Sequence, residues 1–206
     1  MDRAGWPFVG AAAVPAVAAW LWGWLWVAVV CAALALFLAF FFRDPHRVVP
    51  AESSAVVSPA DGRVLIAGVA EPAAAPAGEW KQVSIFLSPL NVHINRIPIG
   101  GVVTKVEHLP GRYLAAYRPE AAAKNERNEV WIERDGRTVV CRQVVGVLAR
   151  RLVCRVARGA TVQTGDRYGL MKFGSRIDLF LPPAVTLEVS VGEVVRGGET
   201  VLARWV

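Results

Sequence analysis

The sequence predicts a mostly β domain that follows an apolar, helical segment at the N-terminus. An uninterrupted run of 39 residues without a charged side chain extends from Ala4 to Phe42. After Pro50, short runs of β-forming residues alternate with Gly and Pro. The Asp135-Gly136 pair lies between two such runs and is typical of a two-residue hairpin turn, because both turn positions accept a positive φ.

The apolar segment is long enough to cross a bilayer, since about 20 residues suffice. It is much longer than the apolar region of a cleaved signal peptide, and only Arg3 precedes it as a charged flank. Two arrangements fit. One is a helical hairpin that turns near residues 22–24; the other is a single span over roughly 20–42 after a looser segment interrupted by Pro7 and Pro15.

Basic residues on both sides of the apolar segment favour the hairpin. Arg3 precedes the run, and Arg43 and Arg47 follow it, so both flanks fit the cytoplasmic side of a membrane. We therefore expect a membrane anchor at 1–47 and a domain at 48–206 on the cytoplasmic face of the cell membrane.

Charge and cysteine content argue against a nucleic-acid-binding protein and against a disulfide-stabilised one. The net charge of +6 suits the anionic head groups of a membrane, whereas the aromatic residues do not interleave with the basic ones as a nucleic-acid surface requires. Cys31, Cys141 and Cys154 form neither a CxxC pair nor an even framework. We expect no nucleic-acid partner, no disulfide framework and no metal site.

The domain after the anchor is expected to consist of short strands. They are predicted at residues 62–70, 81–89, 99–109, 128–144 with the hairpin turn inside, 150–157, 175–182 and 186–195. Only 117–127 has a helical pattern. The segments "VSPADGRVLIAG" and "VSVGEVVRGGETVLARW" each place two strands around a glycine turn. This weak internal similarity predicts a lipoyl-like barrel-sandwich.

The internal similarity is also compatible with a noncatalytic function. A membrane-anchored lipoyl-like sandwich could serve as a carrier or adaptor module. A carrier lysine is expected at the tip of a hairpin, and Lys172 does not clearly occupy such a turn.

His93 is the histidine in the most polar surroundings. It follows an apolar strand and is flanked by Asn91, Asn95 and Arg96, so hydrogen-bonding groups gather in an otherwise apolar segment. His108 ends a strand before a Pro-Gly turn, where a structural or pocket-lining position is expected. Taken alone, His93 fits a buried structural histidine as well as a catalytic one.

Asp61 and Ser175 complete a possible catalytic set with His93. Each of the three ends or begins a β run, and an aspartate, a histidine and a serine are the parts of a base-activated nucleophile. Asp61 precedes a glycine and Ser175 follows Gly174, so ordinary turn and loop positions explain the same residues.

Seven segments carry a resemblance to a known family. They are "FFRDPHR" at 41–47, "SPADGRV" at 58–64, "FLSPLNVHINRIP" at 86–98, "PGRY" at 110–113, "KNERN" at 124–128, "RQVVGVLARRLVC" at 142–154 and "GDRYGLMKFGSRIDLFLP" at 165–182. In this order they resemble the phosphatidylserine decarboxylase family, and specifically its short, membrane-associated, archaeal-type subfamily. The resemblance covers nearly all of the chain after the apolar segment.

The resemblance implies that the chain cleaves itself between Gly174 and Ser175. The Ser175 hydroxyl attacks the Gly174 carbonyl, an ester replaces the peptide bond, and β-elimination splits the chain. Residue 175 becomes a pyruvoyl group, which is then the cofactor. The pieces 1–174 and 175–206 are expected to stay together as a heterodimer, and a higher oligomer is compatible with the sequence.

The same resemblance implies the reaction and its residues. The pyruvoyl carbonyl forms a Schiff base with the amine of phosphatidylserine, and loss of CO2 gives phosphatidylethanolamine. Ser175 and His93 are the expected catalytic residues, with Asp61 as the third. From their own chemistry and position, Arg96, His108 and Asn91 are expected to bind the substrate.

One position departs from the family pattern. Longer relatives carry His-x-x-His where this chain has His93-Ile94-Asn95-Arg96, so Arg96 occupies the place of the second histidine. That histidine is assigned to proton removal during self-cleavage in those relatives. Either His93 serves both maturation and decarboxylation, or maturation uses another base.

Two other functions are to be distinguished from phosphatidylserine decarboxylation. A different pyruvoyl-dependent amino acid decarboxylase, acting on a soluble substrate, needs the same Gly-Ser chemistry but no membrane segment. The noncatalytic sandwich module predicts an intact chain of 22.3 kDa.

Overall fold

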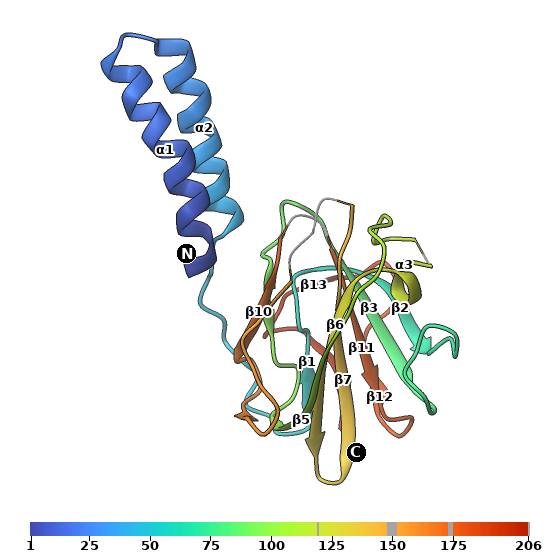
Figure 1. Ribbon diagram of the computed structural model, residues 1–206. Coiled ribbons are helices and arrows are strands. Elements are labelled where there is room, and N and C mark those ends of the chain that lie inside the picture. Colours follow the sequence, from blue (N-terminus) through green and yellow to red (C-terminus); the bar gives the residue numbers. More distant parts are fainter. Residues whose placement is uncertain (119, 148–151, 173–174, 206) are drawn as a thin grey trace. The chain divides into compact units, whose positions relative to one another are not determined.

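The structure is a computed structural model of the whole chain, and it divides into two compact units, Met1–His46 and Arg47–Val206 (Figure 1). The structure describes residues 1–118, 120–147, 152–172 and 175–205.

The N-terminal unit is a helical hairpin. A short 3₁₀ turn, η1 (Arg3–Gly5), leads into α1 (Trp6–Leu21), and α2 (Leu25–Phe41) returns beside it (Figure 1). Gly23 lies in the turn with φ of 78°, a conformation that glycine adopts without strain. The expected hairpin is therefore present, and Pro15 lies inside α1 rather than in a looser segment.

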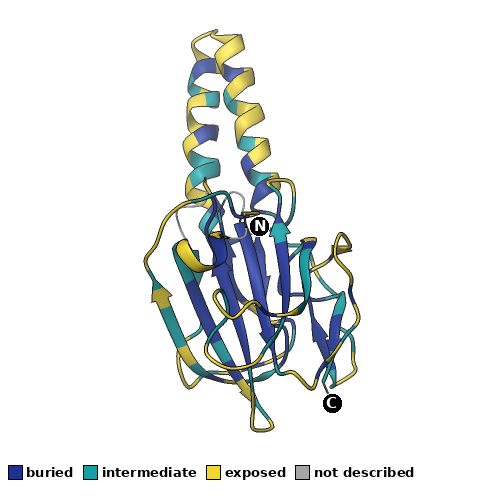
Figure 2. Cartoon of the chain, turned by 90° about the vertical axis from the view of Figure 1, so that its right-hand side faces the viewer, coloured by how far each residue is buried: buried dark blue, intermediate teal, exposed yellow. Residues whose placement is uncertain are grey.

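The surface of this unit is apolar. Arg3–Leu21 spans 19 residues with a mean hydropathy of 1.4, enough by length and composition to cross a membrane, and α2 is a shorter apolar helix of 17 residues. Most of its large apolar side chains are exposed (Figure 2), including Trp20, Trp22, Trp24 and Trp26. Exposed apolar surface of this extent is typical of contact with lipid, so the N-terminal helix indicates membrane association.

The second unit is mostly β, as predicted. Its strands are β1 (Ala55–Val57), β2 (Gly62–Val69), β3 (Lys81–Leu87), β4 (Ile94–Arg96), β5 (Gly101–Leu109), β6 (Arg127–Arg134), β7 (Arg137–Val144), β8 (Leu152–Cys154), β9 (Thr161–Val162), β10 (Arg167–Met171), β11 (Ser175–Leu181), β12 (Thr186–Leu187), β13 (Val194–Val195) and β14 (Val201–Arg204). One short helix, α3 (Ala121–Lys124), lies between β5 and β6.

The main sheet is antiparallel and curls into a half-barrel (Figure 1). Its eight strands run in the order β13-β2-β3-β11-β7-β6-β5-β9, and two three-stranded sheets, β4-β10-β8 and β1-β14-β12, complete the unit. Alternate residues of β11 face opposite sides. Ile177, Leu179 and Leu181 enter the main core, while Phe180 packs in a smaller cluster on the other face with Trp80 and Trp131.

Several predicted elements are confirmed and others are shorter than expected. The hairpin turns at Asp135 and Gly136, whose φ angles are 51° and 72°. The strand expected over 186–195 is two short pieces, β12 and β13, because a turn at Gly192 with φ of 93° interrupts it. The helix expected over 117–127 is limited to the four residues of α3.

Candidate active site

Ser175 begins β11, the central strand between β3 and β7. It pairs with Leu87, and the alternation of the strand places its side chain on the core face with Ile177. The side chain is fully buried, and Oγ has no hydrogen-bond partner within the described part of the chain. Buried hydroxyls normally have a partner, so the unpaired Oγ is compatible with a hydroxyl that is used in chemistry. Gly174, the predicted partner in cleavage, lies outside the described residues.

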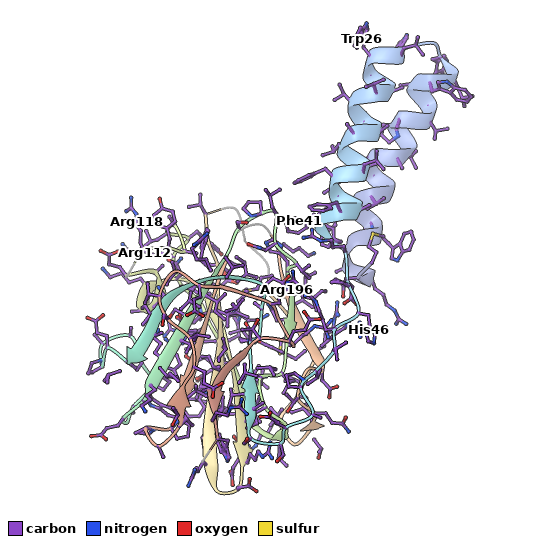
Figure 3. All side chains as sticks on the ribbon, turned by 180° about the vertical axis from the view of Figure 1, so that it is seen from behind. Trp26, Phe41, His46, Arg112, Arg118 and Arg196 are labelled. Carbon is purple, nitrogen blue, oxygen red and sulfur yellow. The ribbon has the colours of Figure 1, made fainter. Side chains whose placement is uncertain are left out.

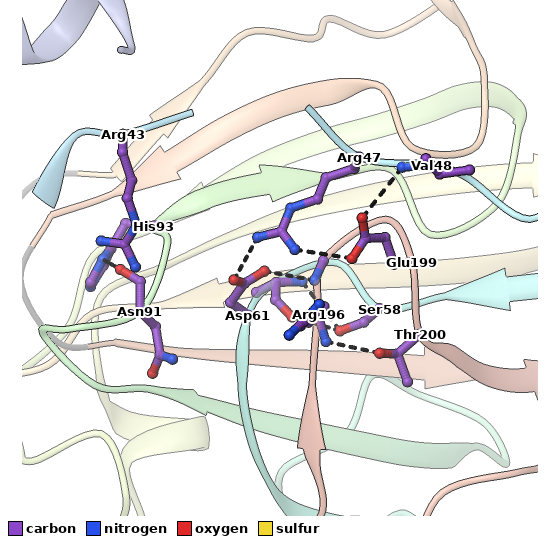
Figure 4. Close-up of polar contacts among 12 residues, drawn as sticks. Arg43, Arg47, Val48, Ser58, Asp61, Asn91, His93, Arg196, Glu199 and Thr200 are labelled. Atoms are coloured by element: carbon purple, nitrogen blue, oxygen red, sulfur yellow. Dashed lines mark hydrogen bonds and ion pairs between the residues drawn. The ribbon is translucent and has the colours of Figure 1, made fainter. Parts of the chain in front are cut away.

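His93 lies between β3 and β4 and is also fully buried. Its Nδ1 is 2.9 Å from the main-chain oxygen of Asn91 (Figure 4). Because a carbonyl oxygen only accepts hydrogen bonds, Nδ1 carries the proton in this contact, and Nε2 is the proton-accepting nitrogen of the neutral ring. The loop thus fixes the tautomer that a general base needs.

A buried amide bridge connects the small sheet that contains β4 with the main sheet. Gln143 on β7 donates from Nε2 to Oδ1 of Asn95 at 2.7 Å, and its own Oε1 accepts from Asn128 at 3.2 Å. A side chain at Gly169 would meet the same amide, since a Cβ there would lie 2.7 Å from Nε2 of Gln143. Glycine at this position leaves room for the bridge.

The bridge fixes where His93 and Ser175 lie. His93 is two residues before Asn95. Ser175 is two residues before Ile177, which pairs with Gln143. In an extended chain, two residues span about 7 Å. Both steps run toward the end of the sheets where β10 leads into β11. The main-chain N–H of Met171, near the end of β10, donates to the oxygen of His93 at 3.2 Å. The register therefore brings His93 and Ser175 to the same end of the sandwich.

Asp61 lies in the turn before β2 and belongs to a different set of contacts (Figure 4). Its Oδ2 is 2.7 Å from Nη2 of Arg47, and its Oδ1 accepts from the N–H of Gly197 at 2.8 Å. Arg47 also pairs with Glu199 at 3.1 Å. Both carboxylate oxygens of Asp61 are therefore engaged by Arg47 and Gly197. Among the residues that the structure describes, no hydrogen bond joins Asp61 to His93.

Asn91 lines a cavity on the face of the sheet opposite the Ser175 side chain, because its lining residues Phe86 and Arg63 pair with each other and Phe86 pairs with Arg176. Its Oδ1 accepts from the N–H and from the Oγ of Ser88, at 2.9 and 2.8 Å. Ser88 follows Leu87, the strand partner of Ser175. The cavity measures about 320 Å³, within the range of small-ligand sites. Its lining residues are Gly62, Arg63, Phe86, Ser88, Asn91 and Val194.

Arg96 and His108, the other two expected substrate-binding residues, do not line this cavity in the described residues. Arg96 is buried and donates from Nη1 to the Gly165 oxygen at 3.0 Å. His108 lies on β5 with 56% of its side chain exposed, and its Nε2 is 3.7 Å from Glu126. The sequence did not single out Phe86 or Arg63, although both lie in segments that carry the family resemblance.

Cys141 is a buried structural thiol. Cys141 is buried with Sγ 3.0 Å from the hydroxyl of Tyr168, and burial raises the pKa of the thiol to about 12. Burial also raises the pKa of Tyr168 well above its usual range. A thiol with so high a pKa is not a nucleophile near neutral pH. In the described ranges, no group of three or more His, Cys, Asp or Glu side chains could hold a metal ion.

Comparison with known proteins agrees with the geometry. The family model for phosphatidylserine decarboxylase matches residues 34–203. The phosphatidylserine decarboxylase proenzyme of Nitrosomonas eutropha is 41% identical over 205 residues, covering 98% of this chain and 94% of the relative. The proenzymes of Burkholderia multivorans (42% identical, 98% of this chain and 94% of the relative) and Salinibacter ruber (44%, 91% and 84%) are similarly close. The chain belongs to the phosphatidylserine decarboxylase family.

Proposed function

We propose that this chain is a proenzyme that cleaves itself between Gly174 and Ser175 and then decarboxylates phosphatidylserine to phosphatidylethanolamine and CO2. The observation that carries the proposal is the Ser175 hydroxyl, which is fully buried and without a hydrogen-bond partner among the described residues, at the Gly-Ser step of the family motif. A hydroxyl held in this way is available for attack on the preceding carbonyl.

The positions of Ser175 and His93 support self-cleavage. Nε2 of His93 takes the hydroxyl proton while Oγ bonds to the carbonyl carbon of Gly174. The C–N bond then breaks, the Ser175 nitrogen gains a proton, and an ester results. Removal of the Cα proton of residue 175 and cleavage of its Cβ–O bond release the carboxylate of Gly174. Water replaces the nitrogen of the resulting dehydroalanine, and ammonia leaves.

The pyruvoyl group formed at residue 175 supplies a carbonyl that accepts electrons as CO2 departs. The fit is good because the buried neighbours Leu87 and Ile177 exclude water around this position. His93, which lies at the same end of the sandwich, can hold a proton and return it to the substrate carbon. Asn91, whose main-chain oxygen contacts Nδ1 of His93, is the proposed contact for the lipid head group.

Asp61 is proposed as a supporting residue of this site. Its carboxylate links Arg47, in the piece 1–174, to the Gly197 N–H, in the piece 175–206. A direct hydrogen bond to His93 would require Asp61 to leave Arg47. The contacts of Arg96 favour a role in holding the loop at Gly165. Substrate contact is better assigned to Asn91 than to Arg96 or His108.

The apolar helices suit an enzyme whose substrate is a membrane lipid. The net charge of +6 attracts anionic lipid, which is the charge class of phosphatidylserine. Arg3 and Arg43 flank the two helices and favour a hairpin with both ends on the cytoplasmic side. We place the chain in the short, membrane-associated subfamily, with the cleavage products 1–174 and 175–206 held together by the pairing of β11 with β3 and β7.

The test is an assay of the full-length protein in vesicles that contain phosphatidylserine labelled in the carboxyl group. Release of labelled CO2 with formation of phosphatidylethanolamine is expected, and Ser175→Ala is expected to abolish both. Free serine tests the soluble-substrate alternative. Turnover of free serine in preference to the lipid, or no turnover of either, would overturn the proposal.

A further inference from the structure

We propose that Arg176 is a positioning residue for residue 175, and that it acts through a buried cluster on the face of the sheet opposite the catalytic face. This inference rests on the proposed function. Arg176 follows Ser175 directly in β11, so its side chain points to the other face of the sheet. It is a charged side chain with only 2% exposure. Few arginines are buried to this extent without a specific set of partners.

The partners form what we term the Arg176 cluster, consisting of Arg176, Asp178, Ser84 and Gln82. Nε of Arg176 is 2.5 Å from Oδ1 of Asp178, and Nη2 donates to Oγ of Ser84 at 3.0 Å. Oγ of Ser84 donates to Oδ1 of Asp178 at 2.6 Å and accepts from Nε2 of Gln82 at 2.9 Å. Two donors and one acceptor thus saturate the Ser84 hydroxyl, and the guanidinium is held on two sides.

The cluster spans the two pieces that self-cleavage creates. Arg176 and Asp178 belong to 175–206, whereas Ser84 and Gln82 lie on β3 in 1–174. After cleavage, residue 175 is a chain terminus, and termini fray unless they are tied down. Arg176, the next residue, forms an ion pair with Asp178 on its own strand and a hydrogen bond with Ser84 on the neighbouring strand. The reactive terminus is therefore kept in register with Leu87.

The same geometry acts before cleavage. Alternation along the strand means that fixing the Arg176 side chain on one face fixes the direction of the Ser175 side chain on the other. Attack on the preceding carbonyl depends on this direction, because an error of about 1 Å in the position of a reacting group can cost about 100-fold in rate.

A second buried ion pair on the main sheet serves as a matched control. Arg142 on β7 donates from Nε to Oε1 of Glu129 on β6 at 2.8 Å, and both residues are buried. The pair has comparable burial, and neither residue adjoins Ser175 in sequence. Arg142 lies opposite Asp178 in the pairing of β7 with β11, so Arg142→Lys controls for a buried arginine that neighbours the cluster without bonding to Ser84. Loss of a buried arginine contact affects folding at both sites, but only the Arg176 cluster should affect the chemistry.

The experiment compares Arg176→Lys with Arg142→Lys in the full-length protein, in detergent micelles. Lysine keeps the charge but cannot bind the carboxylate and the hydroxyl with the same fork. We measure the first-order rate of chain splitting, and then kcat and KM for phosphatidylserine on the cleaved fraction. Arg176→Lys is expected to slow splitting and lower kcat by about 10-fold to 100-fold with KM within about twofold, whereas Arg142→Lys stays near wild type per folded molecule.

Equal effects of the two substitutions, or an Arg176→Lys effect confined to KM, would overturn the positioning role. If Arg176→Lys does not fold, Ser84→Ala decides, because it keeps the Arg176–Asp178 pair and removes only the link to the neighbouring strand. Slower splitting by Ser84→Ala supports the proposal, and splitting at the wild-type rate refutes it. A wild-type chain that neither splits nor decarboxylates the lipid would instead refute the proposed function.

Discussion

Replacing Ser175 by alanine is expected to stabilise the uncleaved chain at the same time as it abolishes maturation. The Oγ of Ser175 is fully buried and has no partner in the described ranges. Burial of an unpaired polar group costs about 1 to 3 kcal/mol, and alanine removes that cost. The space left by one oxygen atom offsets part of the gain. We expect a net increase of about 1 kcal/mol in the free energy of unfolding, or about 2 to 4 °C in Tm.

Ser84 provides the matched comparison with the opposite sign. It lies on the neighbouring strand and is equally buried, but its hydroxyl makes three hydrogen bonds, to Asp178, Arg176 and Gln82. Replacement by alanine leaves these groups with one partner fewer. We expect Ser84→Ala to lower the free energy of unfolding by about 1 to 3 kcal/mol.

The two substitutions are compared in a His93→Ala background, so that the reference chain keeps its serine and the uncleaved form can be isolated by size. Thermal unfolding in detergent micelles is followed by circular dichroism in the β region of the spectrum. A rise in Tm for Ser175→Ala and a fall for Ser84→Ala are expected. If Ser175→Ala lowers Tm as much as Ser84→Ala does, the Ser175 hydroxyl has a stabilising partner and is not held ready for attack.

Three further predictions concern His93, Arg96 and Cys141. His93→Ala should slow turnover by about 100-fold to 10,000-fold in any cleaved fraction assayed at saturating lipid, and near-normal turnover would remove His93 from the chemistry. Arg96→Ala leaves the Gly165 oxygen without its guanidinium donor, so Tm should fall while kcat per cleaved molecule stays near wild type; a large loss of kcat at saturation would place Arg96 in the chemistry. The pKa of Cys141 is raised from 9.0 to about 12, so its contribution to stability is complete below pH 9 and is lost as the pH rises toward 12. Cys141 should accordingly resist alkylation at pH 8 until the protein unfolds, and a labelled Cys141 peptide from folded protein would contradict this.

Much of the fold could be predicted because its signals are local. Asp135-Gly136 is a turn in any context that joins two β runs, and the alternating apolar residues of 175–182 mark a strand without reference to the rest of the chain. The strands at 94–96 and 167–171 were not predicted. They are short, and they exist because they pair with each other, which no local pattern reveals.

The candidate site could be predicted only in part. Ser175 and His93 stood out by residue type and position, but their common location depends on the contact between Asn95 and Gln143, which are 48 residues apart in sequence. The Arg176 cluster was missed. Its signal was present, because "SRID" places two opposite charges on one face of an otherwise apolar strand, and such charges are rarely buried without purpose.

Denaturing mass measurement of the purified full-length protein tests the account most directly. We predict two fragments, 1–174 and 175–206, the smaller with a blocked N-terminus that carries a carbonyl group and reacts with hydrazine. A single intact chain of 22.3 kDa, in a preparation that converts phosphatidylserine to phosphatidylethanolamine, would contradict the account.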